Sequence, residues 1–152
     1  MAYCTVEEVQ AYMKEDYINQ VIANEYLDPE SVDRDAVLIP LLETAIQDAG
    51  SEIDGYLGKR YTVPLSPVPP VINKFAKDIA VYNFGSRAGL EDGDREGNYL
   101  TRYKSAVKFL TLVAEGKVSI GAGGIDPATA ARTGFSVHSN SRLFRRDSMR
   151  GM

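Results

Sequence analysis

The chain has 152 residues, the size of one globular domain. Hydrophobic residues make up 44% and charged residues 25%, which excludes a wholly disordered chain and a membrane protein. A single cysteine, Cys4, and a single histidine, His138, exclude a disulfide framework, a cysteine-based zinc cluster and any catalytic scheme with two histidines. The first ten residues carry acids where a secretion signal would be basic and apolar, so we expect a protein that is cytosolic or assembled from the cytosol.

The net charge of −4 is distributed unevenly along the chain. Residues 132–152 hold five arginines and one aspartate, whereas residues 1–131 hold 12 basic and 20 acidic side chains. A short basic segment attached to an acidic body is typical of an interaction arm more than of an active site.

Two short helices are predicted near the amino terminus. Thr5 and Glu8 have the spacing of a capping box, and the apolar positions that follow predict a helix over residues 6–14. The apolar spacing within residues 18–22 predicts a second brief helix, which we expect to stop before Pro29.

Two longer amphipathic helices are predicted on either side of a proline-rich connector. The first covers residues 37–58, and its regular part should begin at about Ile39 because Pro40 is tolerated only in a first turn. The next segment, TVPLSPVPP, holds four of the seven prolines and predicts an extended, stiff connector. The second helix should begin at Pro70 and end at Gly85.

The last predicted helix, residues 98–115, has the clearest amphipathic pattern of the chain, with Gly116 at its C′ position. We expect its lysines to face outward and the following residues to face inward: Tyr99, Leu100, Tyr103, Ala106, Val107, Leu110, Val113 and Ala114. The predicted fold is therefore mainly α, a small bundle of about four helices over residues 1–117. Residues 118–152 lack a helical period and are predicted to form an extended arm that orders mainly against a partner.

Candidate metal and catalytic sites are few. The acidic run before Gly97 has part of the spacing of a calcium loop, but Tyr103 stands where the bidentate glutamate is required. Asp48 and Glu52 lie one helical turn apart and could share a divalent ion, but no further ligand motif faces them. We therefore predict no catalytic residue, no metal site and no cofactor, and we expect a non-enzymatic protein.

The end of the arm is the strongest candidate for an interaction site. Its guanidinium groups can bind carboxylates or phosphates, and its apolar side chains are suited to an interface. A tail that merely aids solubility is the alternative, and DNA binding by so small a charge would be weak and sensitive to salt. The predicted protein-interaction residues are Arg142, Leu143, Phe144, Arg145, Arg146, Met149 and Arg150.

The stretch AIQDAGSEIDGYLGKRYTVPLSPVPPVINKFAKDIAVYNF resembles a family of small proteins from Mu-like phages and prophages, associated with the head-to-tail connector. The segments Tyr3-Cys4-Thr5, Asp78-Ile79-Ala80 and LFRRDSMRGM are also similar to the pattern of that family. Its most specific part is a structural signature, here Asp54, Gly55, Tyr56, Leu57, Arg60, Tyr61 and Pro64.

The resemblance implies a structural adaptor that forms a ring between the portal of the filled head and the tail. The implied location is the neck of the virion, after assembly in the cytoplasm of a bacterial host, and the gene may belong to a prophage. The implied partners are other copies of the chain, the portal, and tail or neck proteins, with DNA contacted at most non-specifically and no membrane.

Within the signature, we expect Asp54, Tyr56, Arg60 and Tyr61 to hold the helix end against the proline connector. An equally open alternative is simple packing of the two tyrosines, with Arg60 paired to Asp54. Two other functions stay open: a small nucleic-acid-binding regulator that uses the arginine arm, and a metal-assisted hydrolase built on the acidic pair of residues 48 and 52.

Overall fold

The computed structural model describes residues 2–25, 34–87 and 97–121. This part of the chain folds into helices and contains no strand, which confirms the prediction of a mainly α fold. The helices are α1 (Val6–Tyr12), α2 (Glu15–Glu25), α3 (Arg34–Leu57), α4 (Pro70–Arg87) and α5 (Gly97–Ala114). Within the described residues, no helix combines the length and the apolar character needed to cross a membrane.

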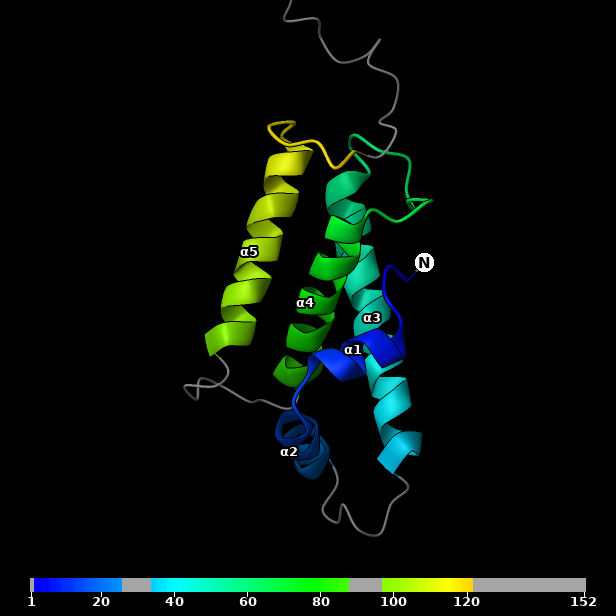
Figure 1. Ribbon diagram of the computed structural model, residues 1–152, viewed down its shortest axis with the longest axis vertical. Coiled ribbons are helices and arrows are strands. Elements are labelled where there is room, and N and C mark those ends of the chain that lie inside the picture. Colours follow the sequence, from blue (N-terminus) through cyan, green and yellow to red (C-terminus); the bar gives the residue numbers. More distant parts are fainter. Residues whose placement is uncertain (1, 26–33, 88–96, 122–152) are drawn as a thin grey trace, which may run out of the picture.

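The three long helices form the body of the bundle, and α4 runs antiparallel to both α3 and α5 (Figure 1). The short α1 crosses α3 and α4, and α2 lies beside their lower ends in the view of Figure 1. All five helices contribute to one cluster of buried apolar side chains, which we call the core. Its largest fully buried members include Val9, Leu38, Ile53, Phe84 and Leu110.

The capping box predicted for the first helix is present. The Thr5 hydroxyl accepts a hydrogen bond from the Glu8 backbone N–H at 3.3 Å, and the Glu8 carboxylate accepts one from the Thr5 N–H at 3.1 Å. The helix nevertheless ends at Tyr12, two residues before the predicted end. Met13 has extended dihedral angles and is buried, so the chain leaves the helix at the point where this side chain enters the core.

Helix α3 begins earlier than predicted, because it starts at Arg34 and includes Pro40 in its interior. The expectation of a regular helix from about Ile39 was wrong. A proline removes one backbone donor and crowds the preceding turn. Here the fully buried side chains of Leu38 and Leu42 continue the same apolar face across the proline, and Pro40 itself is exposed.

Helix α4 begins at Pro70 as predicted but continues past Gly85 to Arg87. The prediction that Gly85 ends the helix was wrong because this glycine serves a close approach between helices. A Cβ atom at position 85 would overlap with the hydroxyl of Tyr17, whose ring contacts Phe84 and Tyr99. The absence of a side chain therefore lets α2 pack against α4.

The inward face of α5 is narrower than the sequence predicts. Ala106, Leu110 and Val113 are fully buried, whereas Leu100 and Val107 are half-buried and do not belong to the core. Because α5 packs against α4 and α3 on one side only, a stripe of three positions is enough to fill that contact.

Candidate interaction site around the proline connector

The chain between α3 and α4 forms an irregular connector, residues 58–69, at one end of the bundle (Figure 1). The peptide bonds before Pro64 and Pro67 are cis. Leu65 and Tyr61 are buried, so the connector packs onto the core instead of standing away from it.

Tyr3 joins the amino-terminal segment to both α3 and the connector. Its hydroxyl donates a hydrogen bond to the carboxylate of Asp54 and accepts one at 3.2 Å from the backbone N–H of Leu65. Burial, together with the bond to Asp54, raises the pKa of Tyr3 to about 12. The phenol therefore stays protonated at neutral pH and can act as a donor and an acceptor at once.

Asn73 in the first turn of α4 extends this arrangement. Its side-chain amide donates hydrogen bonds to the Tyr3 carbonyl and to the Glu8 carboxylate, each at 3.0 Å. The bond from Asn73, followed by the one from the Thr5 backbone, lowers the pKa of Glu8. The capping box of α1 is thereby tied to α4, and we call this network around Tyr3 the amino-terminal joint.

The signature residues Arg60 and Tyr61 connect the end of α3 to the end of α5. The Tyr61 hydroxyl accepts a hydrogen bond from the Ile120 backbone N–H at 3.4 Å. The guanidinium group of Arg60 lies against Gly116, where a Cβ atom would overlap with it. In the described part of the chain, no ion pair joins Arg60 to Asp54, so the pairing considered from the sequence is not formed.

The remaining signature residues have different environments. Leu57 is fully buried, Tyr56 packs partly against the core, and Gly55 lies on an exposed face of α3 with open space around it. Pro64 is exposed and lines a pocket. The structure thus brings together Asp54, the connector and the end of α5, but it does so largely through Tyr3, which the signature did not include.

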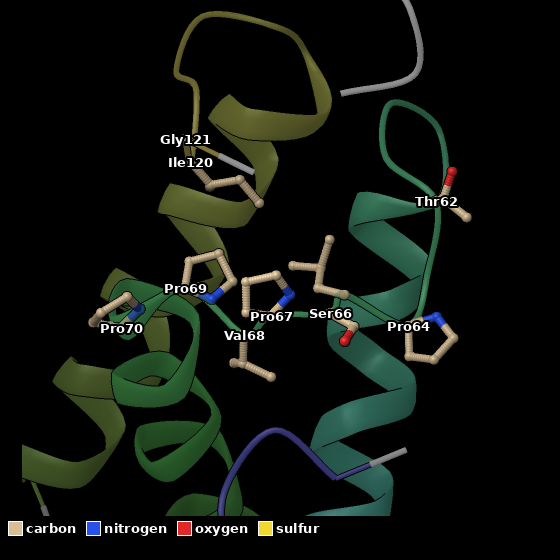
Figure 2. A pocket seen from close by; sticks show the side chains of 10 residues that line it. Thr62, Pro64, Ser66, Pro67, Val68, Pro69, Pro70, Ile120 and Gly121 are labelled. Carbon is tan, nitrogen blue, oxygen red and sulfur yellow. The ribbon is translucent and has the colours of Figure 1, made fainter. Parts of the chain in front are cut away.

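The pocket at the connector has a volume of about 500 Å³ and is lined by residues 62, 64–70, Ile120 and Gly121 (Figure 2). Its lining is apolar and proline-rich, and it includes no acidic, basic, histidine or cysteine side chain. Val68 is 37% exposed, one of two large hydrophobic side chains exposed in the described residues. Such a surface can bind an apolar group, but it offers no reactive group of its own.

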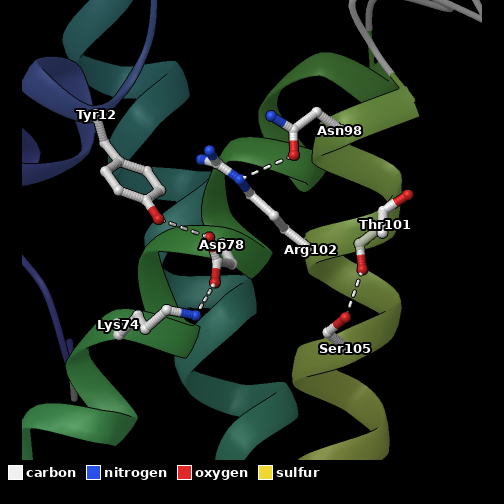
Figure 3. Close-up of polar contacts among 7 residues, drawn as sticks. All are labelled: Tyr12, Lys74, Asp78, Asn98, Thr101, Arg102 and Ser105. Atoms are coloured by element: carbon white, nitrogen blue, oxygen red, sulfur yellow. Dashed lines mark hydrogen bonds and ion pairs between the residues drawn. The ribbon is translucent and has the colours of Figure 1, made fainter.

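A second polar cluster ties α1 to α4 (Figure 3). Asp78 is 2% exposed and is the buried charged residue of the described chain. Its carboxylate accepts hydrogen bonds from the Tyr12 hydroxyl at 3.0 Å and from the Lys74 ammonium group at 3.1 Å. The guanidinium of Arg102 lies 5.2 Å from the centre of the Tyr12 ring and is held by Asn98. The i, i+4 spacing of Lys74 and Asp78 is visible in the sequence, but their link to Tyr12 is not.

The candidate chemical groups are engaged in structural contacts or stand apart. Glu52 accepts a hydrogen bond from the Tyr103 hydroxyl at 3.1 Å, whereas Asp48 is exposed. Burial and the negative charge of Glu52 raise the pKa of Tyr103 to about 12. Burial also raises the pKa of the Cys4 thiol to about 11. Among the described residues, no three His, Cys, Asp or Glu side chains gather into a metal site.

The predicted interaction residues of the arm lie outside the described residues, as does His138. They are Arg142, Leu143, Phe144, Arg145, Arg146, Met149 and Arg150. Their role stays a prediction.

The fold and this site define a small helical-bundle protein whose signature residues serve to join its helices. The chain belongs to the phage family described as Bacteriophage Mu, Gp36, whose model matches residues 3–139. This membership confirms the resemblance to a Mu-like phage family. The match begins at Tyr3 and ends before the LFRRDSMRGM segment.

Two relatives extend the comparison. The chain is 28% identical over 110 residues to the Mu-like prophage FluMu protein gp36 of Haemophilus influenzae, which covers 72% of this chain and 74% of the relative. It is 29% identical over 94 residues to the gene product J of Escherichia phage Mu, which covers 62% of this chain and 57% of the relative.

Proposed function

We propose that the protein is a structural subunit of a phage particle, a head-to-tail connector that assembles as a ring between the portal and the tail. The observation that carries this proposal is the family match over residues 3–139, which includes the amino-terminal joint and the connector. The protein works by self-association and docking and has no enzymatic activity.

The use of the signature residues supports a mechanical role. Asp54 and Tyr61 hold the amino-terminal segment, α3, the connector and the end of α5 in one arrangement. A ring subunit must keep its binding surfaces at a fixed angle, because small errors accumulate around the ring. A joint that fixes three chain segments at one end of the bundle meets this requirement.

The arm provides the contact with the portal or a neighbouring subunit. Phe144, Arg145 and Arg146 combine an aromatic anchor with guanidinium groups, which suits docking onto a protein surface. Acidic residues elsewhere keep the DNA channel non-adhesive, because they repel the phosphate backbone.

The test is light scattering with negative-stain imaging of the protein alone and mixed with the portal protein of the same phage or prophage. We expect rings, or a collar stacked on the portal. A chain that lacks residues 141–152 should keep its helicity and melting temperature but lose portal association.

Absence of any assembly on the portal would contradict the proposed function. Normal assembly of the shortened chain would contradict the role of the arm alone. A salt-dependent shift of duplex DNA at submicromolar protein would instead favour a nucleic-acid-binding regulator.

A further inference from the structure

The two outer helices of the bundle carry opposite charges. Helix α5 contains Arg102, Lys104 and Lys108 and no acidic residue. Helix α3 contains five acidic residues, and its one basic residue, Arg34, is its first. The separation concerns whole helices, since the ends of α3 and α5 differ in sign in the same way as their middles.

The charges at the centre of these faces have no partner within the described chain. Lys104 and Lys108 are exposed on α5, and Glu43 and Asp48 are exposed on α3. None of the four forms an ion pair with another described residue; the three ion pairs found there involve other side chains. Two lysines at i and i+4 repel each other, so an acidic surface that docks on them would relieve this repulsion.

Apolar side chains accompany these charges. Leu100 lies one turn before Lys104 and Leu112 one turn after Lys108, and both leucines are half-buried and outside the core. Ile39, which is 42% exposed, lies one turn before Glu43 on α3. Each face therefore combines charge with the apolar surface that a protein interface needs at its centre.

The two faces belong to different sides of the molecule, because α4 lies between α3 and α5 (Figure 1). We propose that the basic face of α5, centred on Lys104 and Lys108, binds the acidic face of α3, centred on Glu43 and Asp48, of a second copy. Such a contact joins unlike surfaces, so it repeats from copy to copy and closes a ring when the rotation permits. The inference rests on the proposed ring and identifies the surfaces that form it.

Two charge-reversed full-length variants test the contact. The first carries Lys104→Glu and Lys108→Glu, so both of its faces are acidic. The second carries Glu43→Lys and Asp48→Lys, so both of its faces are basic. Each variant alone should self-associate at least about tenfold more weakly than the wild type in sedimentation equilibrium at low salt, because like charges then meet at every contact.

An equimolar mixture of the two variants is the decisive sample. Every contact between unlike variants again pairs an acidic with a basic face, so the mixture should recover association that neither variant shows alone. Circular dichroism should give both variants the helicity of the wild type. Matched controls move the same charges elsewhere: Lys14→Glu with Lys59→Glu, and Glu7→Lys with Asp16→Lys, all at exposed positions. They should associate like the wild type.

The same variants are then mixed with the portal protein and imaged. A collar that forms equally well with the wild type and with each reversed variant would overturn this inference and leave the proposed function intact. Failure of the two variants to associate when mixed would also overturn it. Failure of the wild type to assemble, alone or on the portal, would overturn the proposed function as well.

Discussion

A single side chain, that of Tyr3, connects the amino-terminal segment to two distant parts of the chain. Asp54 lies 51 positions away and Leu65 lies 62 positions away. The Leu65 N–H is buried, so without the phenol it would lose its partner and could not regain one from water. The hydroxyl therefore matters for stability more than its apolar ring alone would suggest.

Replacement of this hydroxyl by Tyr3→Phe should destabilise the protein by about 1–3 kcal/mol, because a buried donor and a carboxylate both lose a partner. Urea unfolding at neutral pH measures the change. Tyr56→Phe is the control, since this hydroxyl forms no hydrogen bond with the rest of the described chain, and it should leave the free energy of unfolding within about 0.5 kcal/mol of the wild type.

The same residue should make stability depend on pH in the alkaline range. The pKa of Tyr3 rises from 10.0 to about 12 on folding. A raised pKa contributes stability that is complete below pH 10 and is lost as the pH rises towards 12, because the unfolded chain ionises first. Unfolding free energies measured across this range should fall less steeply for Tyr3→Phe than for the wild type. Equal slopes would contradict the assignment.

At the scale of the elements, the end of α5 depends on a glycine and on the end of α3. Gly116 has a φ angle of +81°, and the guanidinium of Arg60 fills the space where a side chain would lie. Gly121 has a φ angle of +73° but has nothing within 4 Å. The two glycines share a conformation and differ in their neighbours.

This difference gives a prediction for three variants. Gly121→Ala should cost about 1–2 kcal/mol for the left-handed conformation alone. Gly116→Ala should cost more, because it also displaces Arg60. Adding Arg60→Ala to Gly116→Ala should remove the excess, and thermal unfolding measures all three.

Equal costs for the two glycines would mean that Arg60 adapts freely. Arg60→Ala alone should lower the melting temperature and leave assembly on the portal unchanged if its role is confined to this packing.

At the scale of the whole molecule, the core continues past the predicted end of the bundle at residue 117. Ile120 is 8% exposed and belongs to the core, Val118 packs against it, and the Ile120 N–H is bonded to Tyr61. The end of the folded body therefore lies beyond α5 itself.

Two truncations test where the folded body ends. A chain that stops after Gly121 should unfold in one transition near the melting temperature of the full chain, because it keeps every described core residue. A chain that stops after Lys117 should be less stable by about 1–3 kcal/mol, the contribution of one buried apolar side chain of this size. Equal stability of the two chains would support the boundary at residue 117.

The sequence alone determined the helices, because their apolar residues repeat every three or four positions, as in the face from Leu38 to Leu57 and the stripe of Ala106, Leu110 and Val113. It also determined the capping box of α1, the start of α4 at Pro70 and the family, since these signals are local or carried by a contiguous motif.

Only the tertiary structure decided how distant residues meet. Periodicity does not reveal that Tyr3 bonds to Asp54, that Arg60 lies against Gly116, or that Gly85 continues a helix in order to admit Tyr17. It also left Leu100 and Val107 inside a helix that packs on one side only. The physical reason is the same in each case: a local pattern fixes which face of a helix is apolar, whereas the contacts of that face depend on which other helices cover it.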